Sequence, residues 1–336
     1  MTEQEVLAQS RGAFAQWGEQ WKRQAEMNGK LYKKHNRTQK ELLNCGLGRQ
    51  LLCVATGYSF ERDIELIKKY KCNVDIACVD KSFAALMDHG IKPRFVVIAD
   101  ANIPYSYAKK HIHETQDIYL IANVTSQTGW THNWKGPVIF YVNKDNINTE
   151  KIYGEISGCK ELIPASSNVG NTVVVFFTQV GGYDRYILTG YDYAWSENNY
   201  YAFGDSDKRH WMKHLTCIGT DGKIYYTSQN LHFSARWLDD YGRKVNGRIY
   251  NCSGAGILPL NNCDLEKKLA QCGQRALSQN EYSGYFQSRT ESRRVDYRGP
   301  EEIVAEIQKH KYIAGIDIHF LPDNINPKPE EVLKAS

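Results

Sequence analysis

The chain has 336 residues, 42% of them hydrophobic, and a formal net charge of +4. This is the composition of an ordinary globular protein with a buried core, and the charge neither demands nor excludes a nucleic-acid partner. The sequence carries no signal-peptide pattern and no apolar run long enough to cross a membrane. We therefore expect neither secretion nor a membrane span.

The nine cysteines predict a reducing compartment. They form no CxxC pair and no Cys/His cluster, and Cys53, Cys78 and Cys252 fall inside apolar stretches. Cysteines in this pattern are typical of buried thiols in an intracellular protein. We therefore expect a cytoplasmic protein.

The first 44 residues predict a helical arm. Apolar residues recur there at roughly helical spacing among many charges: Val6, Phe14, Trp17, Trp21 and Leu31. Such an arm packs on the core or mediates self-association, so a homo-oligomer is one expectation.

Three apolar strands follow, and each runs directly into a small polar turn. They read LLCVATGYS, DIACVDKS and FVVIADAN, and the helical stretches FERDIELIKKY and SFAALMDHG separate them. This alternation predicts two βαβ units of a parallel sheet, with further strands at 118–122 and 137–142. Because the carboxyl ends of parallel strands line the ligand crevice of open α/β sheets, the turn residues should share one pocket: Gly57, Ser59, Asp80, Ser82, Asp100 and Asn102.

A second polar cluster surrounds an apolar helix in residues 166–195. The helix begins after SSNVGNT, ends at Gly181-Gly182, and is followed by a strand over 185–189. Backbone amides at such a loop-to-helix junction are suited to hold phosphate. The polar residues at the helix start and at the strand end are Asn168, Gly170, Asn171, Thr172, Gly190, Tyr191 and Asp192.

The sequence therefore predicts an α/β protein with a Rossmann-like, mostly parallel sheet flanked by helices. We divide it into a helical arm (1–44), a nucleotide-binding catalytic domain (45–263) and a C-terminal helical extension (264–336). A loop-rich segment over 195–232 resembles a functional loop or lid, followed by a helix over 233–245 and a strand over 248–253.

The individual motifs leave alternatives open. The turn Gly57-Tyr58-Ser59 matches neither GxGxxG nor GxxxxGK[ST], so it is a ligand turn of another kind or a plain structural turn. Asp80 and Asp100 suit a sugar hydroxyl, a ribose or a divalent cation, but a helix cap or a loop hydrogen bond explains them as well.

The loop-rich segment holds the candidate general base, His210. A histidine there suits proton transfer because its unperturbed pKa is about 6.5. An exposed loop histidine without a function is an equal alternative, and His214 and His232 compete for the role. The chain has no HExxH or GxSxG motif, which disfavours a zinc site of that kind and covalent hydrolase chemistry.

Four stretches together resemble a known family: ATGYSFERDIELIKKY, CVDKSFAALMDHGIKPRFVVIADAN, SSNVGNT and ILTGYDYAW. They are similar to the domain shared by motility-associated-factor flagellin glycosyltransferases and archaeal 6-hydroxymethylpterin diphosphokinases, over about residues 48–258. The glycosyltransferase branch is similar in fold to bacterial sialyltransferases, which bind a CMP-sugar and need no metal.

The resemblance implies roles for particular residues. The implied nucleotide and donor contacts are Gly57, Tyr58, Ser59, Asp80, Ser82, Asn168, Gly170, Asn171 and Gly190. Tyr191 or Tyr193 would stabilise the departing phosphate, and His210 would activate the acceptor hydroxyl. Tyr58 stands where the family usually has proline, which puts the conformation of that turn in doubt.

We therefore expect a glycosyltransferase that moves a sugar, for instance a nonulosonic acid, from a nucleotide-sugar, with a CMP-sugar favoured. No cofactor or metal is required in this interpretation, and the acceptor is a protein, a glycan or a modified nucleic-acid base. The first alternative is Mg-ATP-dependent pyrophosphoryl transfer to a hydroxymethylpterin, with Asp80 and Asp100 holding Mg²⁺. Asp100-Ala101-Asn102 lacks the second carboxylate usual in that branch. A second alternative is a non-catalytic nucleotide-binding or scaffold protein.

Overall fold

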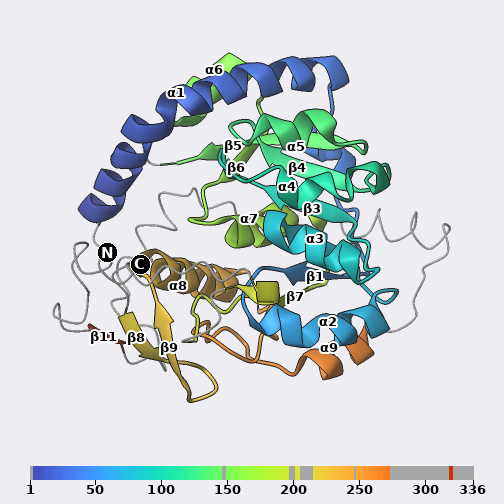
Figure 1. Ribbon diagram of the computed structural model, residues 1–336, viewed down its shortest axis with the longest axis vertical. Coiled ribbons are helices and arrows are strands. Elements are labelled where there is room, and N and C mark those ends of the chain that lie inside the picture. The colour runs from blue at the N-terminus through green and yellow to red at the C-terminus, as the bar shows by residue number, and fades with distance from the viewer. Residues whose placement is uncertain are drawn as a thin grey trace, which may run out of the picture.

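The computed structural model describes residues 3–145, 149–196, 201–204, 215–245, 247–272 and 318–320. Its centre is an eight-stranded sheet in the order β10-β7-β1-β2-β3-β4-β5-β6, in which every pairing is parallel (Figure 1). The strands are β1 (Gln50–Val54), β2 (Asp75–Val79), β3 (Phe95–Ile98), β4 (Tyr119–Asn123), β5 (Val138–Lys144), β6 (Leu162–Pro164), β7 (Arg185–Thr189) and β10 (Ile249–Asn251). The mostly parallel α/β sheet predicted from the sequence is confirmed.

Helices cover both faces of this sheet. Their bounds are α1 (Glu3–His35), α2 (Ser59–Tyr70), α3 (Asp80–Asp88), α4 (Ser106–Lys109), α5 (Thr128–Asn133), α6 (Thr149–Ser157), α7 (Val169–Phe176), α8 (Gln229–Lys244) and α9 (Leu265–Gln271). Short helical turns are η1 (Gln39–Leu42), η2 (Ile112–Glu114) and η4 (Ala202–Gly204), and the π-helical η3 (Phe177–Gly181) extends α7. In the described part of the chain, no helix is both long and apolar enough to cross a membrane.

The alternation of side chains along each strand builds two cores. Leu51 and Cys53 of β1 pack with the residues of α7, η3 and α8, whereas Leu52 and Val54 pack with those of α2 and α3. Strands buried on both faces in this way read as continuous apolar runs, which is why they are legible in the sequence.

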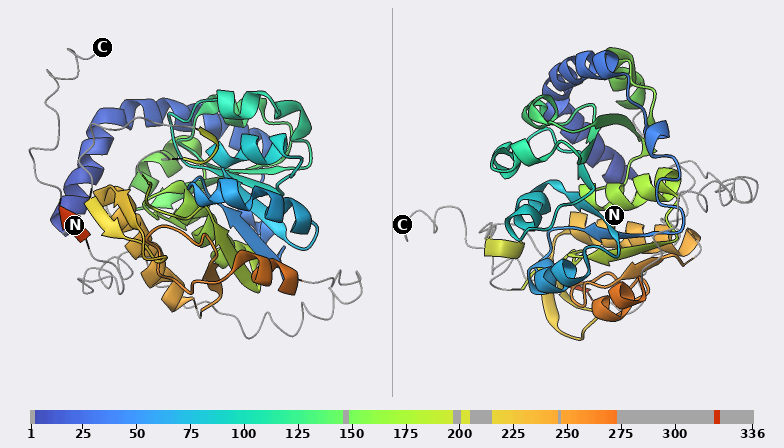
Figure 2. Two further views of the ribbon diagram at one scale, coloured as in Figure 1. Left: turned by 60° about the horizontal axis from the view of Figure 1, so that its bottom comes forward. Right: turned by 90° about the vertical axis from the view of Figure 1, so that its right-hand side faces the viewer.

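The N-terminal arm is a long helix, as expected. Helix α1 arches over α5 and α6 along the outside of the molecule (Figures 1 and 2). Asn28 anchors it: its Nδ2 donates to the carbonyl oxygens of Val124 and Ser126 at 2.8 and 2.9 Å, and its Oδ1 accepts from the Thr131 hydroxyl. The arm therefore packs on the core, the first of the two arrangements considered.

A second, antiparallel sheet lies outside the strands predicted from the sequence. Two of its strands fall in the segment predicted as loop, and the third falls in the extension predicted as helical, most of which lies outside the described residues. The strands β8 (Leu215–Ile218) and β9 (Ile224–Thr227) form a hairpin, and β11 (Ile318–Phe320) pairs with β8. Gly222 supplies the left-handed conformation of the hairpin turn, with a φ of 79°. Strands of four residues with partly exposed side chains carry too little periodicity to be distinguished from loop.

Candidate functional site

The carboxyl ends of β1 and β7 meet at the point where the strand order reverses. From β1 the chain proceeds through β2 to β6, and α7 then returns it to the opposite side of β1, where β7 lies. Ligands of open α/β sheets bind outside the carboxyl ends of the strands at such a switch point. This position is therefore the expected site.

Two glycines bring the turns after β1 and β7 into contact. The Gly57 amide donates to the Gly190 carbonyl oxygen at 2.8 Å, and Gly190 has a φ of 71°. A Cβ on Gly57 would lie 2.6 Å from that same oxygen, and a Cβ on Gly190 would lie 2.7 Å from the carbonyl oxygen of Ala55. Both positions therefore require a residue without a side chain.

Ser59 and Asp192 join the same two turns from the inside. The Asp192 carboxylate accepts from the Ser59 amide at 2.8 Å and from the Ser59 hydroxyl, and both residues are buried. Burial raises the pKa of Asp192 to about 6. Neither side chain lines the cavity described below, so the structure places them in the support of the site.

An open cavity of about 700 Å³ occupies the switch point. We call it the switch-point pocket. Among the described residues that line it, none carries a charged side chain, and four are aromatic. The lining is Ala55, Thr56, Gly57, Val79, Asn168, Val169, Gly170, Gly190, Tyr191, Tyr193, Ala194, Trp195, Tyr201 and Leu231.

The N-terminus of α7 opens into this pocket. Asn168 is its N-cap, and the Asn168 side chain accepts from the Asn171 amide at 2.9 Å. The amides of Val169 and Gly170, in the first turn, have no acceptor within the helix. With the helix dipole behind them, these amides favour an anionic group in the pocket.

Tyr191 and Tyr193 line the pocket, but their hydroxyl groups bond to the protein. The Tyr191 hydroxyl donates to the Gly170 carbonyl oxygen at 2.9 Å, and the Tyr193 hydroxyl donates to Oδ1 of Asn171. Burial holds the pKa of both phenols well above the ordinary value. In this conformation both hydroxyl protons are engaged, so what these residues present to the pocket is aromatic surface.

Asn171 lies behind that wall. It is fully buried, and its Nδ2 donates to the Ser234 carbonyl oxygen at 3.0 Å while its Oδ1 holds Tyr193. The structure thus connects Asn171 to α8 and to the aromatic wall, and does not place it in the pocket lining.

The other predicted contacts lie along the edge of the sheet. Asp80 is buried in the first turn of α3, and Ser82, in the same turn, donates to the carbonyl oxygens of Val54 and Val79. Asp100 is exposed and accepts from the Asn102 amide at 2.7 Å. None of these four residues, nor the half-exposed Tyr58, lines the switch-point pocket.

Of the candidate bases, His210 and His214 lie outside the described residues. His232 is on α8 and is mostly buried; burial, followed by the charge of Arg236, lowers its pKa to about 4. His232 is therefore neutral at pH 7, and it does not line the switch-point pocket.

The model of one protein family matches residues 25–198, more than half of the chain; the family is described as 6-hydroxymethylpterin diphosphokinase MptE-like. The chain belongs to this MptE-like family. The match ends just after the GYDYAW segment, so it includes both turns of the switch point. The family resemblance stated from the sequence is confirmed.

A solved structure, that of a MAf glycosyltransferase from Magnetospirillum magneticum AMB-1, has the same fold, with a TM-score of 0.55 and 17% sequence identity. The alignment covers 87% of this chain and 44% of that protein, so the MptE-like chain spans less than half of its length. No curated protein matches the chain.

A Mg²⁺ ion in an MptE-like site would need several oxygen ligands. The described residues contain no group of three His, Cys, Asp or Glu side chains that suits a metal. Burial raises the pKa of Asp80, and the charge of Asp100 contributes to that rise. Two carboxylates alone do not make a complete magnesium site among the described residues.

Sequence reasoning missed several residues of the MptE-like pocket. Thr56, Val169, Trp195, Tyr201 and Leu231 line it but were not predicted as contacts. Thr56, Val169 and Trp195 are inside quoted motifs, so their place beside the predicted contacts was a usable signal. Leu231 belongs to α8, and nothing local in the sequence indicates that this helix starts beside α7.

Proposed function

We propose that the protein transfers a group from a nucleotide-activated donor, and that the donor is a nucleotide-sugar, with a CMP-sugar favoured. One observation carries the proposal: the pocket at the switch point combines aromatic walls with the amides of an α-helix N-terminus, and the part of its lining that the structure describes holds no charged side chain. Aromatic rings suit the flat faces of a base or a sugar, and the amides suit its phosphate.

The same amides supply the chemistry that such a transfer needs. When the sugar leaves the nucleotide, negative charge develops on the phosphate oxygens, and preorganised N–H groups stabilise it without reorganisation. Val169 and Gly170 are the residues we assign to this role. His210 remains our proposed base for the acceptor hydroxyl. The acceptor is a protein, a glycan or a hydroxylated nucleic-acid base.

Pyrophosphoryl transfer from Mg-ATP to a pterin alcohol is the second candidate, and the description of the family favours it. In that reaction Asp80 and Asp100 would contribute ligands to Mg²⁺, which would neutralise charge on the transferred phosphates. The two candidates differ in metal dependence. We expect turnover to survive EDTA; loss of turnover that Mg²⁺ restores would select the diphosphokinase.

The binding experiment is a thermal-shift measurement with CMP, UDP, GDP and ATP, each with and without Mg²⁺. We expect at least one nucleotide to raise the melting temperature, since a ligand bound only to the native state stabilises it. Binding without any turnover would support the scaffold alternative. Absence of a shift with every nucleotide would contradict the proposed function.

Replacing the side-chain amide of Asn168 by a carboxylate tests whether the phosphate of the donor lies at the start of α7. Asn168→Asp keeps the side-chain acceptor that caps α7 but places a carboxylate beside the proposed phosphate. We expect it to weaken nucleotide binding by about tenfold or more while changing stability little. Asp264→Asn is the matched control, because it exchanges the same two residue types at the N-cap of α9, which does not line the pocket. Equal nucleotide affinity in both variants would remove α7 from the site.

A further inference from the structure

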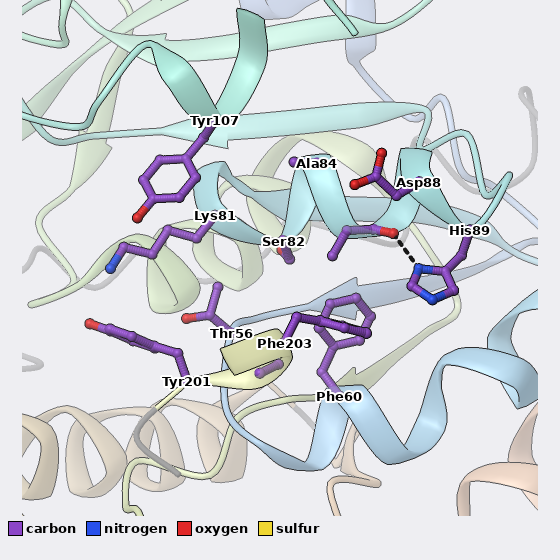
Figure 3. Close-up of a pocket in the computed structure, with 12 residues that line it drawn as sticks. Thr56, Phe60, Lys81, Ser82, Ala84, Asp88, His89, Tyr107, Tyr201 and Phe203 are labelled. Atoms are coloured by element: carbon purple, nitrogen blue, oxygen red, sulfur yellow. Dashed lines mark hydrogen bonds between the residues drawn. The ribbon is translucent and has the colours of Figure 1, made fainter. Parts of the chain in front are cut away.

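A second cavity adjoins the switch-point pocket. It is open to solvent, has a volume of about 670 Å³, and lies between the first turn of α2, the length of α3, α4 and residues 201–203 (Figure 3). We call it the aromatic pocket. Thr56 and Tyr201 line both cavities. Two molecules, one in each cavity, would therefore meet at these two residues.

An aromatic ring forms one wall of the aromatic pocket. Phe203 packs edge-on against Phe60, with ring centroids 5.3 Å apart, and tilts against His89 at 5.2 Å. Even so, 38% of Phe203 is exposed. A ring that is held from behind and open in front is a surface on which a second ring can stack.

The backbone of this wall is fastened to the end of β1 and to α2. The Ala202 amide donates to the Thr56 carbonyl oxygen at 3.1 Å, and the Phe203 amide donates to Oε2 of Glu61 at 2.7 Å. Phe203 also has a φ of 60°, a left-handed conformation that is costly for an aromatic residue. The protein therefore maintains an unfavourable conformation whose result is an exposed ring at this position.

A cation lies at the end of the aromatic pocket near the shared residues. The Lys81 ammonium is 3.8 Å from the centroid of the Tyr201 ring and 5.8 Å from that of Tyr107, and Figure 3 shows it reaching between the two rings. At the other end, the Asp88 carboxylate bonds to Lys110 and His111. Lys81 thus places a positive charge where the two cavities meet.

We propose that the aromatic pocket binds the acceptor substrate, a small molecule or terminal residue that stacks a ring on Phe203 and directs an oxygen-rich or anionic group to Lys81. This inference rests on the proposed function, since a transferase needs two adjoining substrates. It assigns the donor to the switch-point pocket with its helix amides and the acceptor to the aromatic pocket with its stacking ring.

For a sugar donor, the sugar passes from the nucleotide in the switch-point pocket to the acceptor in the aromatic pocket. The acceptor hydroxyl oxygen bonds to the anomeric carbon while the bond from that carbon to the phosphate oxygen breaks. The phosphate oxygen keeps the electron pair, and the hydroxyl proton passes to the proposed general base and from there to water. Thr56 and Tyr201 flank the space in which this exchange takes place.

Two ring-bearing probes test the assignment: phenyl glucoside, which carries an aromatic and a sugar ring, and phenyl phosphate, which is anionic. Ligand-observed NMR titrations of the full chain measure each Kd, with and without a saturating nucleotide. We expect both probes to bind without displacing the nucleotide. Phe203→Ala should weaken both by about tenfold, and Phe203→Tyr should restore them. Lys81→Met should weaken phenyl phosphate more than phenyl glucoside.

Ile224→Ala, on the exposed face of β9, is the control and should change neither affinity. Displacement of a probe by the nucleotide would overturn the inference, because the aromatic pocket would then belong to the donor site. Failure of either probe to bind, or equal binding by wild type and Phe203→Ala, would overturn it as well. Failure of the proposed function would appear in the measurements with nucleotides, whereas failure of this inference would appear in the probe titrations. The two failures are therefore distinguishable.

Discussion

At the scale of single residues, the site depends on two glycines, which have no side chain, and on polar side chains that bond to the protein. Gly57 and Gly190 let two backbones touch, and Ser59 and Asp192 then join the turns by hydrogen bonds between residues 133 positions apart. Much of the lining of the switch-point pocket therefore consists of backbone and aromatic surface. Some of the polar side chains predicted as ligand contacts therefore support the pocket instead of lining it.

Gly57→Ala should destabilise the protein. Its Cβ would lie 2.6 Å from both the Asp192 Cγ and the Gly190 carbonyl oxygen, so the joined turns must separate. We expect the free energy of unfolding to fall by about 1 to 3 kcal/mol in urea titrations. Gly18→Ala in α1 is the matched control, since its Cβ meets nothing closer than 3.7 Å and alanine favours a helix. Equal stability of the two variants would contradict this account of the junction.

Asp80 should make stability depend on pH. Burial, together with the charge of Asp100, raises its pKa from 3.8 to about 7. The folded protein therefore holds this proton more tightly than the unfolded chain does. The resulting stabilisation is complete below pH 3.8 and is lost as the pH rises through about 7.

Melting temperatures measured between about pH 4 and pH 8 test this dependence. The wild type should lose stability across that range, and Asp80→Asn, which cannot titrate, should lose less. A variant curve parallel to that of the wild type would show that Asp80 has no raised pKa.

At the scale of elements, α1 and α7 differ in what holds them. Helix α7 is apolar and buried between the sheet and α8, so its packing was legible in the sequence. Helix α1 is mostly polar, and a few buried groups anchor it. Gly29 is one of them, because a Cβ there would lie 2.5 Å from the Cα of Ser157 in α6.

Asn28→Ala should loosen α1 from the sheet. The substitution leaves the carbonyl oxygens of Val124 and Ser126 and the Thr131 hydroxyl without the partner they now share. We expect a loss of roughly 3 kcal/mol in the free energy of unfolding, because buried polar groups would be left unpaired. Lys30→Ala, exposed on the same helix, should change stability by less than about 0.5 kcal/mol. A similar loss in both would indicate a general effect on the helix.

At the scale of the whole molecule, the exposure of the cysteine thiols indicates how well the core is shielded from solvent. All nine cysteines are free, and Cys72 alone among them is exposed. Burial raises the pKa of the Cys53 and Cys78 thiols well above the ordinary value, so little reactive thiolate forms there.

An aromatic disulfide reagent should therefore modify one thiol rapidly in the native protein. Cys72→Ser should remove that rapid phase, while the six buried thiols react only as the chain unfolds. Several rapid thiols in the native protein would contradict the packing described.

Local sequence patterns predict the central strands of the main sheet and the edge at which the polar turns gather. Apolar runs and polar turns are only a few residues long, so the strands near residues 51, 75, 95 and 185 and the polar entry to the helix near Asn168 were readable from composition and spacing. The short hairpin β8–β9 was not, because its pattern is too brief.

Packing between distant segments decides which of those polar residues line the switch-point pocket and which support it. Placing β7 beside β1 pairs Gly190 with Gly57 and turns Ser59, Asp192 and Asn171 toward protein partners. It also brings Tyr201 between two cavities. Strand order and hydrogen-bond partners depend on packing between segments more than a hundred residues apart, and no local pattern encodes that choice.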